Sequence, residues 1–273
     1  MRWAKSSARE SFSMTSTLPR CPCTRFTEMT VDRPFLLLST RPEDAAANEE
    51  RLSFQTKMRI PEDAIEQRRV EQGPLGDVDL DTYSGVLLGG SPFNHTEPSK
   101  SELQLRIERE IGILVNEIID RDFPLMGACY GIGTVGSAIG ARLGDEHAEE
   151  AGMVELLLTD DAVDDPLLEG FPKSFPTLVG HKEAISELPE SATLLLTGIE
   201  CPTQMFRVKT NVYATQFHPE LTAETLEARL RLYAHLGYFR LDVFDDILET
   251  AYAHDYSYSN RILANFAERY RRF

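Results

Sequence analysis

The chain has 273 residues, of which 42% are hydrophobic and 26% charged, and its formal net charge is -16. This composition is ordinary for a globular protein, and the acidic excess argues against a broad nucleic-acid-binding surface, which needs clustered Lys and Arg. No apolar run approaches the roughly 20 residues that span a bilayer, so we expect neither a nucleic acid nor a membrane as a partner.

Residues 1–30 differ from the rest, because they are rich in Arg, Ser and Thr and contain no apolar run. We expect them to be disordered or a start-site extension, with Met14 and Met29 as alternative starts, although an organelle transit peptide has a similar composition. Cys21 and Cys23 could pair or bind a metal in principle, but four cysteines do not make a disulfide framework. A reducing cytoplasm is therefore the expected location.

Beyond this segment, short apolar runs alternate with helical patterns, which indicates parallel strands joined by crossover helices. Strands are predicted at 35–38, 85–88 and 124–126. A helix is predicted between the last two strands, starting behind a capping box at 99–102, because apolar residues recur at helical spacing. The residues in that pattern are Leu103, Ile107, Ile111, Leu114 and Ile118.

A glycine-rich helix is predicted at 132–139, and strand candidates then follow closely. They lie at 154–158, 193–196, 205–208 and 212–217, and further helices are predicted at 225–236, 243–253 and 260–271. Closely spaced strands after parallel units indicate an antiparallel segment added to a parallel sheet. We expect an α/β fold with a mostly parallel central sheet flanked by helices, formed by a catalytic domain at 31–236 with a helical extension at 237–273 packed on it.

Cys129 is the first candidate for chemistry, because it stands between Gly127 and Gly131 where an apolar strand ends. A sharp strand-to-helix turn would expose the sulfur, and the N-terminus of the following helix would stabilise the thiolate. The two glycines would permit close backbone approach and unusual dihedral angles. The alternative is a buried structural cysteine.

His218 and Glu220 are the second candidates, because His218 precedes a proline and is expected to be extended, so that both side chains point to similar sides. The carboxylate would then orient the imidazole as the base for Cys129. A simple turn after a strand is the alternative.

Gly89 and Gly90 follow a strand, and their backbone N–H groups, with that of Tyr130, could stabilise an oxyanion. An ordinary tight turn is the alternative here.

These three segments, in this order, resemble a class I glutamine amidotransferase, a family with a flavodoxin-like sheet, and the resemblance runs from about 35 to 221. It implies that Cys129 is the nucleophile, His218 the general base and acid, and Glu220 the orienter. It implies no metal and no cofactor. His181 also matches a family loop, and we expect a structural or partner-surface role for it.

One position departs from the family pattern, which usually has a glutamine four residues after the cysteine to hold the substrate, where this chain has Gly133. We assign substrate contacts to Gly133 and Gln216, and we expect that Gly133→Gln would restore a hydrogen bond to glutamine.

Three functions remain open. The first is release of ammonia from glutamine to a synthetase on a partner chain, since this chain has no phosphate-binding loop of its own. The second is stand-alone hydrolysis of γ-glutamyl amides or peptides, and the third is a non-catalytic subunit that keeps the fold.

Overall fold

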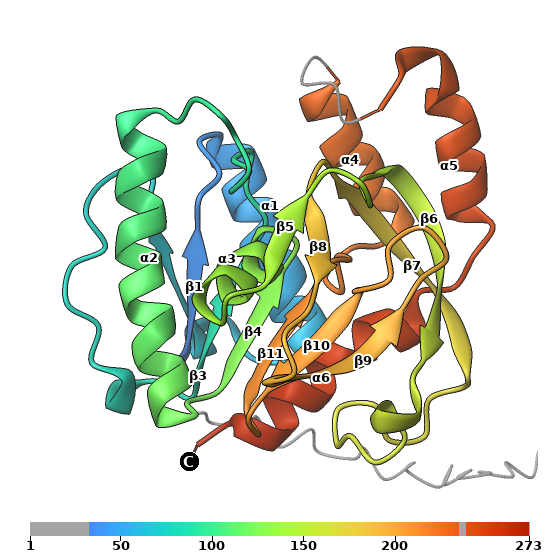
Figure 1. The fold of residues 1–273 in the computed structure, drawn as a ribbon. Coiled ribbons are helices and arrows are strands. Elements are labelled where there is room, and N and C mark those ends of the chain that lie inside the picture. Colours follow the sequence, from blue (N-terminus) through green and yellow to red (C-terminus); the bar gives the residue numbers. More distant parts are fainter. Residues whose placement is uncertain (1–32, 235–238, 273) are drawn as a thin grey trace, which may run out of the picture.

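The computed structural model describes residues 33–234 and 239–272. The predicted extension at 1–30 lies outside the described residues. Within them the chain forms a central sheet with helices on both faces (Figure 1), as the α/β pattern predicts.

The central sheet has nine strands in the order β2-β1-β3-β4-β11-β10-β9-β6-β7 among the described residues. The first five are parallel, and the rest are antiparallel to their neighbours. The strands are β1 (Phe35–Ser39), β2 (Ile65–Arg69), β3 (Gly85–Leu88), β4 (Leu125–Ala128), β6 (Glu149–Leu158), β7 (Ser174–His181), β9 (Ala192–Thr197), β10 (Met205–Val208) and β11 (Val212–Thr215). A separate small sheet pairs β5 (Arg142–Gly144) with β8 (Ala184–Glu187). The predicted fold class, including its antiparallel addition, is confirmed.

The helices are α1 (Asp44–Met58), α2 (Glu102–Arg121), α3 (Tyr130–Ala138), α4 (Ala223–Tyr233), α5 (Phe244–Tyr252) and α6 (Ser257–Tyr270). One apolar cluster places α1 and α6 against one face of the sheet, and a second places α2 and α3 against the other. The alternating side chains of β1 divide between these two clusters, and all five of its residues are buried. A strand covered on both faces must be apolar throughout, which is why this run is so easily recognised in the sequence.

The C-terminal helices contact different parts of the molecule. α6 packs on α1, and its Phe266 ring lies 6.0 Å from that of Phe35 in β1. α4 and α5 pack together beside β6 and β7, at the upper right in Figure 1, with Leu178 of β7 in their shared apolar cluster.

The helix α1 and the strands β2, β5, β7 and β8 went unpredicted, and for α1 and β2 the physical reason is clear. The buried face of α1 consists mostly of small or polar residues, with only Phe54 and Met58 as large apolar side chains, so it shows no apolar stripe. β2 is an edge strand in which only Ile65 is buried, so its sequence resembles a loop.

The cap of α2 also differs from its prediction. Ser101, rather than Ser99, is the N-cap residue, and its hydroxyl accepts a hydrogen bond of 3.1 Å from the Gln104 N–H. The sequence offered two serines in adequate positions, and only the path of the preceding loop selects between them.

Among the described helices, none combines the length and apolarity that crossing a bilayer requires.

Candidate active site

The candidate residues meet because three neighbouring parallel strands end at the same edge of the sheet. β3, β4 and β11 lie side by side. Gly89 follows directly after β3 and Cys129 after β4, and His218 comes three residues after the end of β11. In an open α/β sheet, the carboxyl ends of the strands form the usual position for a binding crevice. Segments far apart in the sequence therefore converge on one place.

Cys129 is the N-cap residue of α3 and has a positive φ of 54° with ψ of -94°. Its N–H donates a 2.8 Å hydrogen bond to the Thr215 carbonyl at the end of β11, which holds the strained residue between the two strands. The predicted sharp turn is present, but its unusual dihedral angle falls on the cysteine and not on the glycines.

The flanking glycines provide space instead. A Cβ atom on Gly127 would lie 3.0 Å from the Gly131 backbone, and one on Gly131 would lie 3.1 Å from the Leu88 carbonyl oxygen. The first turn of α3 can approach β3 and β4 this closely only because neither position carries a side chain.

His218 lies between Glu220 and Cys129. Its Nδ1–H donates a 2.8 Å hydrogen bond to Glu220 Oε1, and its side chain lines the same pocket as the Cys129 thiol. Burial alone would lower the pKa of His218, but the Glu220 carboxylate and Cys129 together raise it to about 9. The structure therefore places His218 beside Glu220 and in one pocket with Cys129, and the catalytic roles of the three side chains stay a prediction.

Arg229 of α4 completes the surroundings of Glu220. Its Nη1 donates to Glu220 Oε1 at 3.1 Å and lies 3.3 Å from His218 Nδ1, and its Nη2 bonds Glu49 of α1 at 2.9 Å. Burial would raise the pKa of Glu220, but His218 and Arg229 lower it well below its usual range. The carboxylate thus stays ionised although it is fully buried.

The Gly89–Gly90 backbone is held in a different way from the one predicted. The Gly89 N–H donates to the Leu38 carbonyl at 3.2 Å, and the Gly90 N–H donates to the buried Glu50 carboxylate at 3.1 Å. Glu50 also accepts from Arg41 Nε at 2.8 Å. In this structure both glycine N–H groups therefore have acceptors, whereas Tyr130 stands in the first turn of α3, where N–H groups lack intrahelical partners.

The space around Gly133 is occupied. A Cβ atom there would lie 2.8 Å from the His95 ring and 3.1 Å from Glu183 Oε1. The His95 ring stacks on that of Tyr130 with centroids 4.6 Å apart, and Glu183 accepts hydrogen bonds from the N–H groups of His95 and Thr96. A side chain at 133 would therefore require the His95 ring to move, and the expected benefit of Gly133→Gln stays a prediction that depends on this movement.

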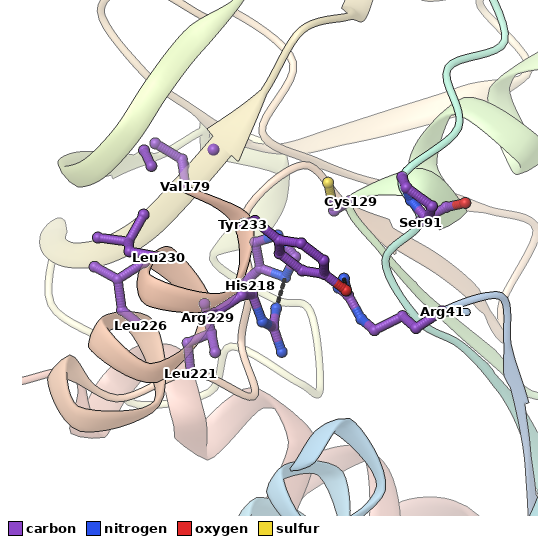
Figure 2. Close-up of a pocket in the computed structure, with 13 residues that line it drawn as sticks. Arg41, Ser91, Cys129, Val179, His218, Leu221, Leu226, Arg229, Leu230 and Tyr233 are labelled. Atoms are coloured by element: carbon purple, nitrogen blue, oxygen red, sulfur yellow. Dashed lines mark hydrogen bonds between the residues drawn. The ribbon is translucent and has the colours of Figure 1, made fainter. Parts of the chain in front are cut away.

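Two pockets open on either side of Cys129. The leucine pocket, which also contains His218, is lined by α4 and β7 and measures about 540 Å³ including its open part. Its lining includes Arg41, Ser91, Ala151, Val179, Leu221, Leu226, Leu230 and Tyr233. Figure 2 shows the leucine side chains on one side of this pocket and Cys129 with Ser91 on the other.

The polar pocket, of about 280 Å³ including its open part, lies on the Tyr130 side of the thiol. Its lining includes Asn94, Tyr130, Lys182, Glu183 and Gln216. The Gln216 side chain is buried, and its Oε1 has no hydrogen-bond partner among the described residues. A buried acceptor without a partner is costly, which makes it a natural contact for a ligand that donates hydrogen bonds.

Comparison with known proteins agrees with this arrangement. The family model for Glutamine amidotransferase class-I matches residues 55–231, which is more than half of the chain. The chain belongs to this family.

The relatives of this chain include larger proteins. A GMP synthase [glutamine-hydrolyzing] of Borreliella burgdorferi is 26% identical over 149 residues, which are 55% of this chain and 27% of that protein. One of Streptococcus thermophilus is 31% identical over 141 residues, which are 50% of this chain and 24% of that protein. The chain therefore spans about a quarter of the length of these relatives.

Solved structures support the same fold over most of the chain. A glutamine amidotransferase from Thermotoga maritima superposes with a TM-score of 0.71 at 21% identity, over 89% of this chain and 99% of that one. A glutamine amido transferase from Methylobacillus flagellatus gives a TM-score of 0.68 at 14% identity, over 89% of this chain and 97% of that one.

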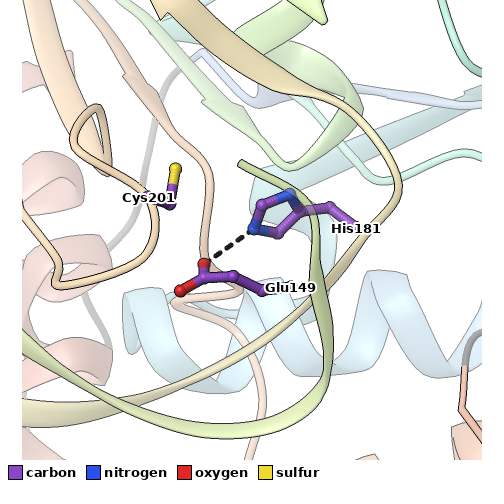
Figure 3. A group of neighbouring side chains, drawn as sticks. All are labelled: Glu149, His181 and Cys201. Carbon is purple, nitrogen blue, oxygen red and sulfur yellow. Dashed lines mark hydrogen bonds and ion pairs between the residues drawn. The ribbon is translucent and has the colours of Figure 1, made fainter. Parts of the chain in front are cut away.

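His181, which lines the polar pocket, forms a group with Glu149 and Cys201 whose ligand types would suit a metal ion (Figure 3). Hydrogen bonds already engage it: His181 Nδ1 lies 2.9 Å from the Glu183 carbonyl, and Nε2 lies 2.8 Å from Glu149 Oε2. Burial raises the pKa of Cys201 to about 12, which keeps it a thiol and a poor ligand.

The partner-surface role considered for His181 is wrong, because the side chain is buried. Through its bonds to Glu149 and Glu183 it fixes the segment that lines both pockets.

Sequence reasoning missed several residues around the site. They are Arg41, Glu49, Glu50, His95, Glu183 and Arg229. No local motif marks them, although an arginine on the expected helix 225–236, close in sequence to His218, was an available signal.

Proposed function

We propose that this chain is a thiol-dependent amidase that hydrolyses the side-chain amide of a γ-glutamyl group. The observation that carries the proposal is the position of His218, whose ring bonds Glu220 and lines one pocket together with the Cys129 thiol. A nucleophile, a base and an orienting carboxylate in this relation are the components of covalent acyl transfer. Membership in the amidotransferase family supports the same chemistry.

In the proposed mechanism, the Cys129 sulfur attacks the amide carbonyl carbon while His218 holds the thiol proton. The Tyr130 N–H stabilises the developing oxyanion. Gly89 and Gly90 would first have to release their present acceptors, so we assign the second donor to the adjacent N–H of Ser91, a residue that lines both pockets.

The C–N bond then breaks, and His218 gives its proton to the departing nitrogen. Water, activated by the same histidine, hydrolyses the thioester, releases glutamate and restores the thiol. Glu220 keeps the imidazole oriented and stabilises its protonated form throughout.

The polar pocket is our proposed site for the amino-acid end of the substrate. The unpartnered Gln216 Oε1 and the Glu183 carboxylate suit an α-ammonium group, and Lys182 brings positive charge for the α-carboxylate. Substrate contact at Gly133 itself is limited to backbone, since His95 fills the adjacent space.

A synthetase on a separate chain as ammonia acceptor is the first form of this function, because the matched relatives are longer proteins whose names include glutamine hydrolysis. A stand-alone γ-glutamyl hydrolase is the second form. The occupied space at Gly133 bears equally on both forms, because glutamine and other γ-glutamyl amides present the same amino-acid end to the polar pocket.

The proposal is tested by labelling Cys129 with a glutamine-like diazo-ketone and locating the adduct by mass spectrometry. We expect one adduct on Cys129, none in Cys129→Ala, and normal labelling in Cys201→Ala, because Cys201 is buried and its pKa is raised. Equal turnover by wild type and Cys129→Ala would exclude covalent catalysis.

A further inference from the structure

The leucine pocket lies on the side of the thiol where the departing amine must leave. In thiol acyl transfer the histidine protonates the leaving nitrogen, so that nitrogen is next to His218 when the C–N bond breaks. Of the two pockets at Cys129, the leucine pocket contains His218, and the polar pocket contains Tyr130. The two parts of the substrate are therefore assigned to different pockets.

Ammonia, the amine released from glutamine, needs almost no space and prefers polar contacts. The leucine pocket offers the opposite, because Leu221, Leu226 and Leu230 come from or adjoin α4, and Val179 faces them from β7. The space that admits the centre of a water-sized sphere is about 50 Å³, and the outline of about 540 Å³ includes open solvent, so a group the size of an amino-acid side chain would lie partly among the leucines and partly at the open mouth.

The two arginines of this pocket are bonded to carboxylates, although the buried Nε of Arg229 has no hydrogen-bond partner among the described residues. Arg229 bonds Glu220 and Glu49, and Arg41 bonds Glu50 and Tyr233. Apart from Ser91, Cys129 and His218, the remaining wall is mostly apolar, so a substituent that enters the pocket gains free energy mainly by leaving water.

We propose that the physiological substrate is a γ-glutamyl amide whose nitrogen carries a branched aliphatic or aromatic group, which occupies the leucine pocket. This inference rests on the proposed function and names the leaving amine. The reaction balances as hydrolysis: the amide and one water give glutamate and the free amine, and the amine nitrogen takes its proton from His218.

The first experiment compares three substrates by glutamate release: glutamine, γ-glutamyl-3-methylbutylamide and γ-glutamyl-leucine. A hydrophobic pocket discriminates by about ten-fold or more for each methylene that it accommodates. We therefore expect kcat/KM for the better of the two larger substrates to be at least about ten-fold above that for glutamine. The two larger substrates differ by one carboxylate. Whichever of them is hydrolysed faster shows whether the leaving group is a simple amine or an amino acid.

The second experiment fills the pocket. Leu230→Trp should lower the ratio of kcat/KM for the branched amide to that for glutamine at least ten-fold. Ala228→Trp is the matched control, because it adds the same ring at an exposed position of α4 and should keep the wild-type ratio. Leu226→Ala, which enlarges the pocket without adding bulk, should also reduce the ratio and serves if Leu230→Trp does not fold.

A wild-type protein that prefers glutamine over both larger substrates would overturn this inference and leave the proposed amidase intact. Failure of the diazo-ketone to label Cys129, together with no turnover of any substrate, would instead overturn the proposed function itself.

Discussion

At the residue scale, the candidate site buries the His218 imidazole and the Glu220 carboxylate and balances their charges. Glu220 is fully buried, and it stays ionised because His218 and Arg229 both donate to it. Removing one member of a buried charged group leaves the others uncompensated, and this usually costs more than the net contribution of the pair.

The roles of His218 and Glu220 predict unequal losses on mutation. His218→Asn should lower kcat about 10³-fold or more, because it removes the group that transfers the proton. Glu220→Gln keeps the hydrogen-bonding length and should cost less, about 10- to 100-fold. Steady-state kinetics of both variants test this, and equal losses with unfolded circular-dichroism spectra would mark the segment as a structural turn.

Arg229 is predicted to act as a positioning residue. Arg229→Met removes a positive charge 3.3 Å from His218 Nδ1, so the protonated imidazole becomes easier to form and the pKa of His218 rises. We expect kcat/KM to fall about ten-fold and the basic limb of its pH profile to move upward.

Arg231→Met is the control for this variant, because Arg231 lies on the same helix but is exposed. Arg229→Lys should recover part of the activity. An unshifted pH profile in Arg229→Met would reduce Arg229 to a purely structural contact.

At the element scale, α3 is a short helix that depends on its close approach to β3 and β4. The same substitution in two helices should therefore have opposite effects. Gly131→Ala places a Cβ atom 3.1 Å from the Leu88 carbonyl in the middle of the sheet, and it should lower the free energy of unfolding by about 1–3 kcal/mol. Gly112→Ala in α2 meets no atom within 4 Å and should raise it by about 0.5–1 kcal/mol.

Urea denaturation of the two glycine variants measures both changes. A stabilised Gly131→Ala variant would show that the strand-to-helix turn at Cys129 does not need the close packing described above.

At the scale of the whole molecule, the buried pair makes stability depend on pH. The pKa of His218 is raised from 6.5 to about 9, so its contribution is fully present below pH 6.5 and is lost as the pH rises through 9. The pKa of Glu220 is lowered, so its contribution is present above its ordinary value of 4.5 and is lost on acidification. We expect stability to decline by about 1–3 kcal/mol between pH 6.5 and 9.

Thermal unfolding across this range tests the prediction. His218→Asn should flatten the decline relative to the wild type. A wild-type stability that rises between pH 6.5 and 9 would contradict the assigned charge state.

The sequence alone determined the elements whose signals are local. Apolar runs marked β1, β3 and β4, and the spacing of His218 and Glu220 predicted that their side chains point to similar sides, where a 2.8 Å hydrogen bond joins them. These patterns are readable because the burial of a strand and the geometry of a turn depend on residues that are neighbours in the chain.

Only the tertiary structure decided the surroundings of these residues. The Arg229–Glu49 bond joins positions 180 apart, Gly90 is held by a carboxylate 40 residues away, and His95 fills the space beside Gly133. The leucine pocket likewise exists only because α4 packs opposite β7. Such contacts have no sequence period, since they depend on how separate elements pack. They determine which N–H groups are available to a substrate, and in our proposal they also determine which amine the site accepts.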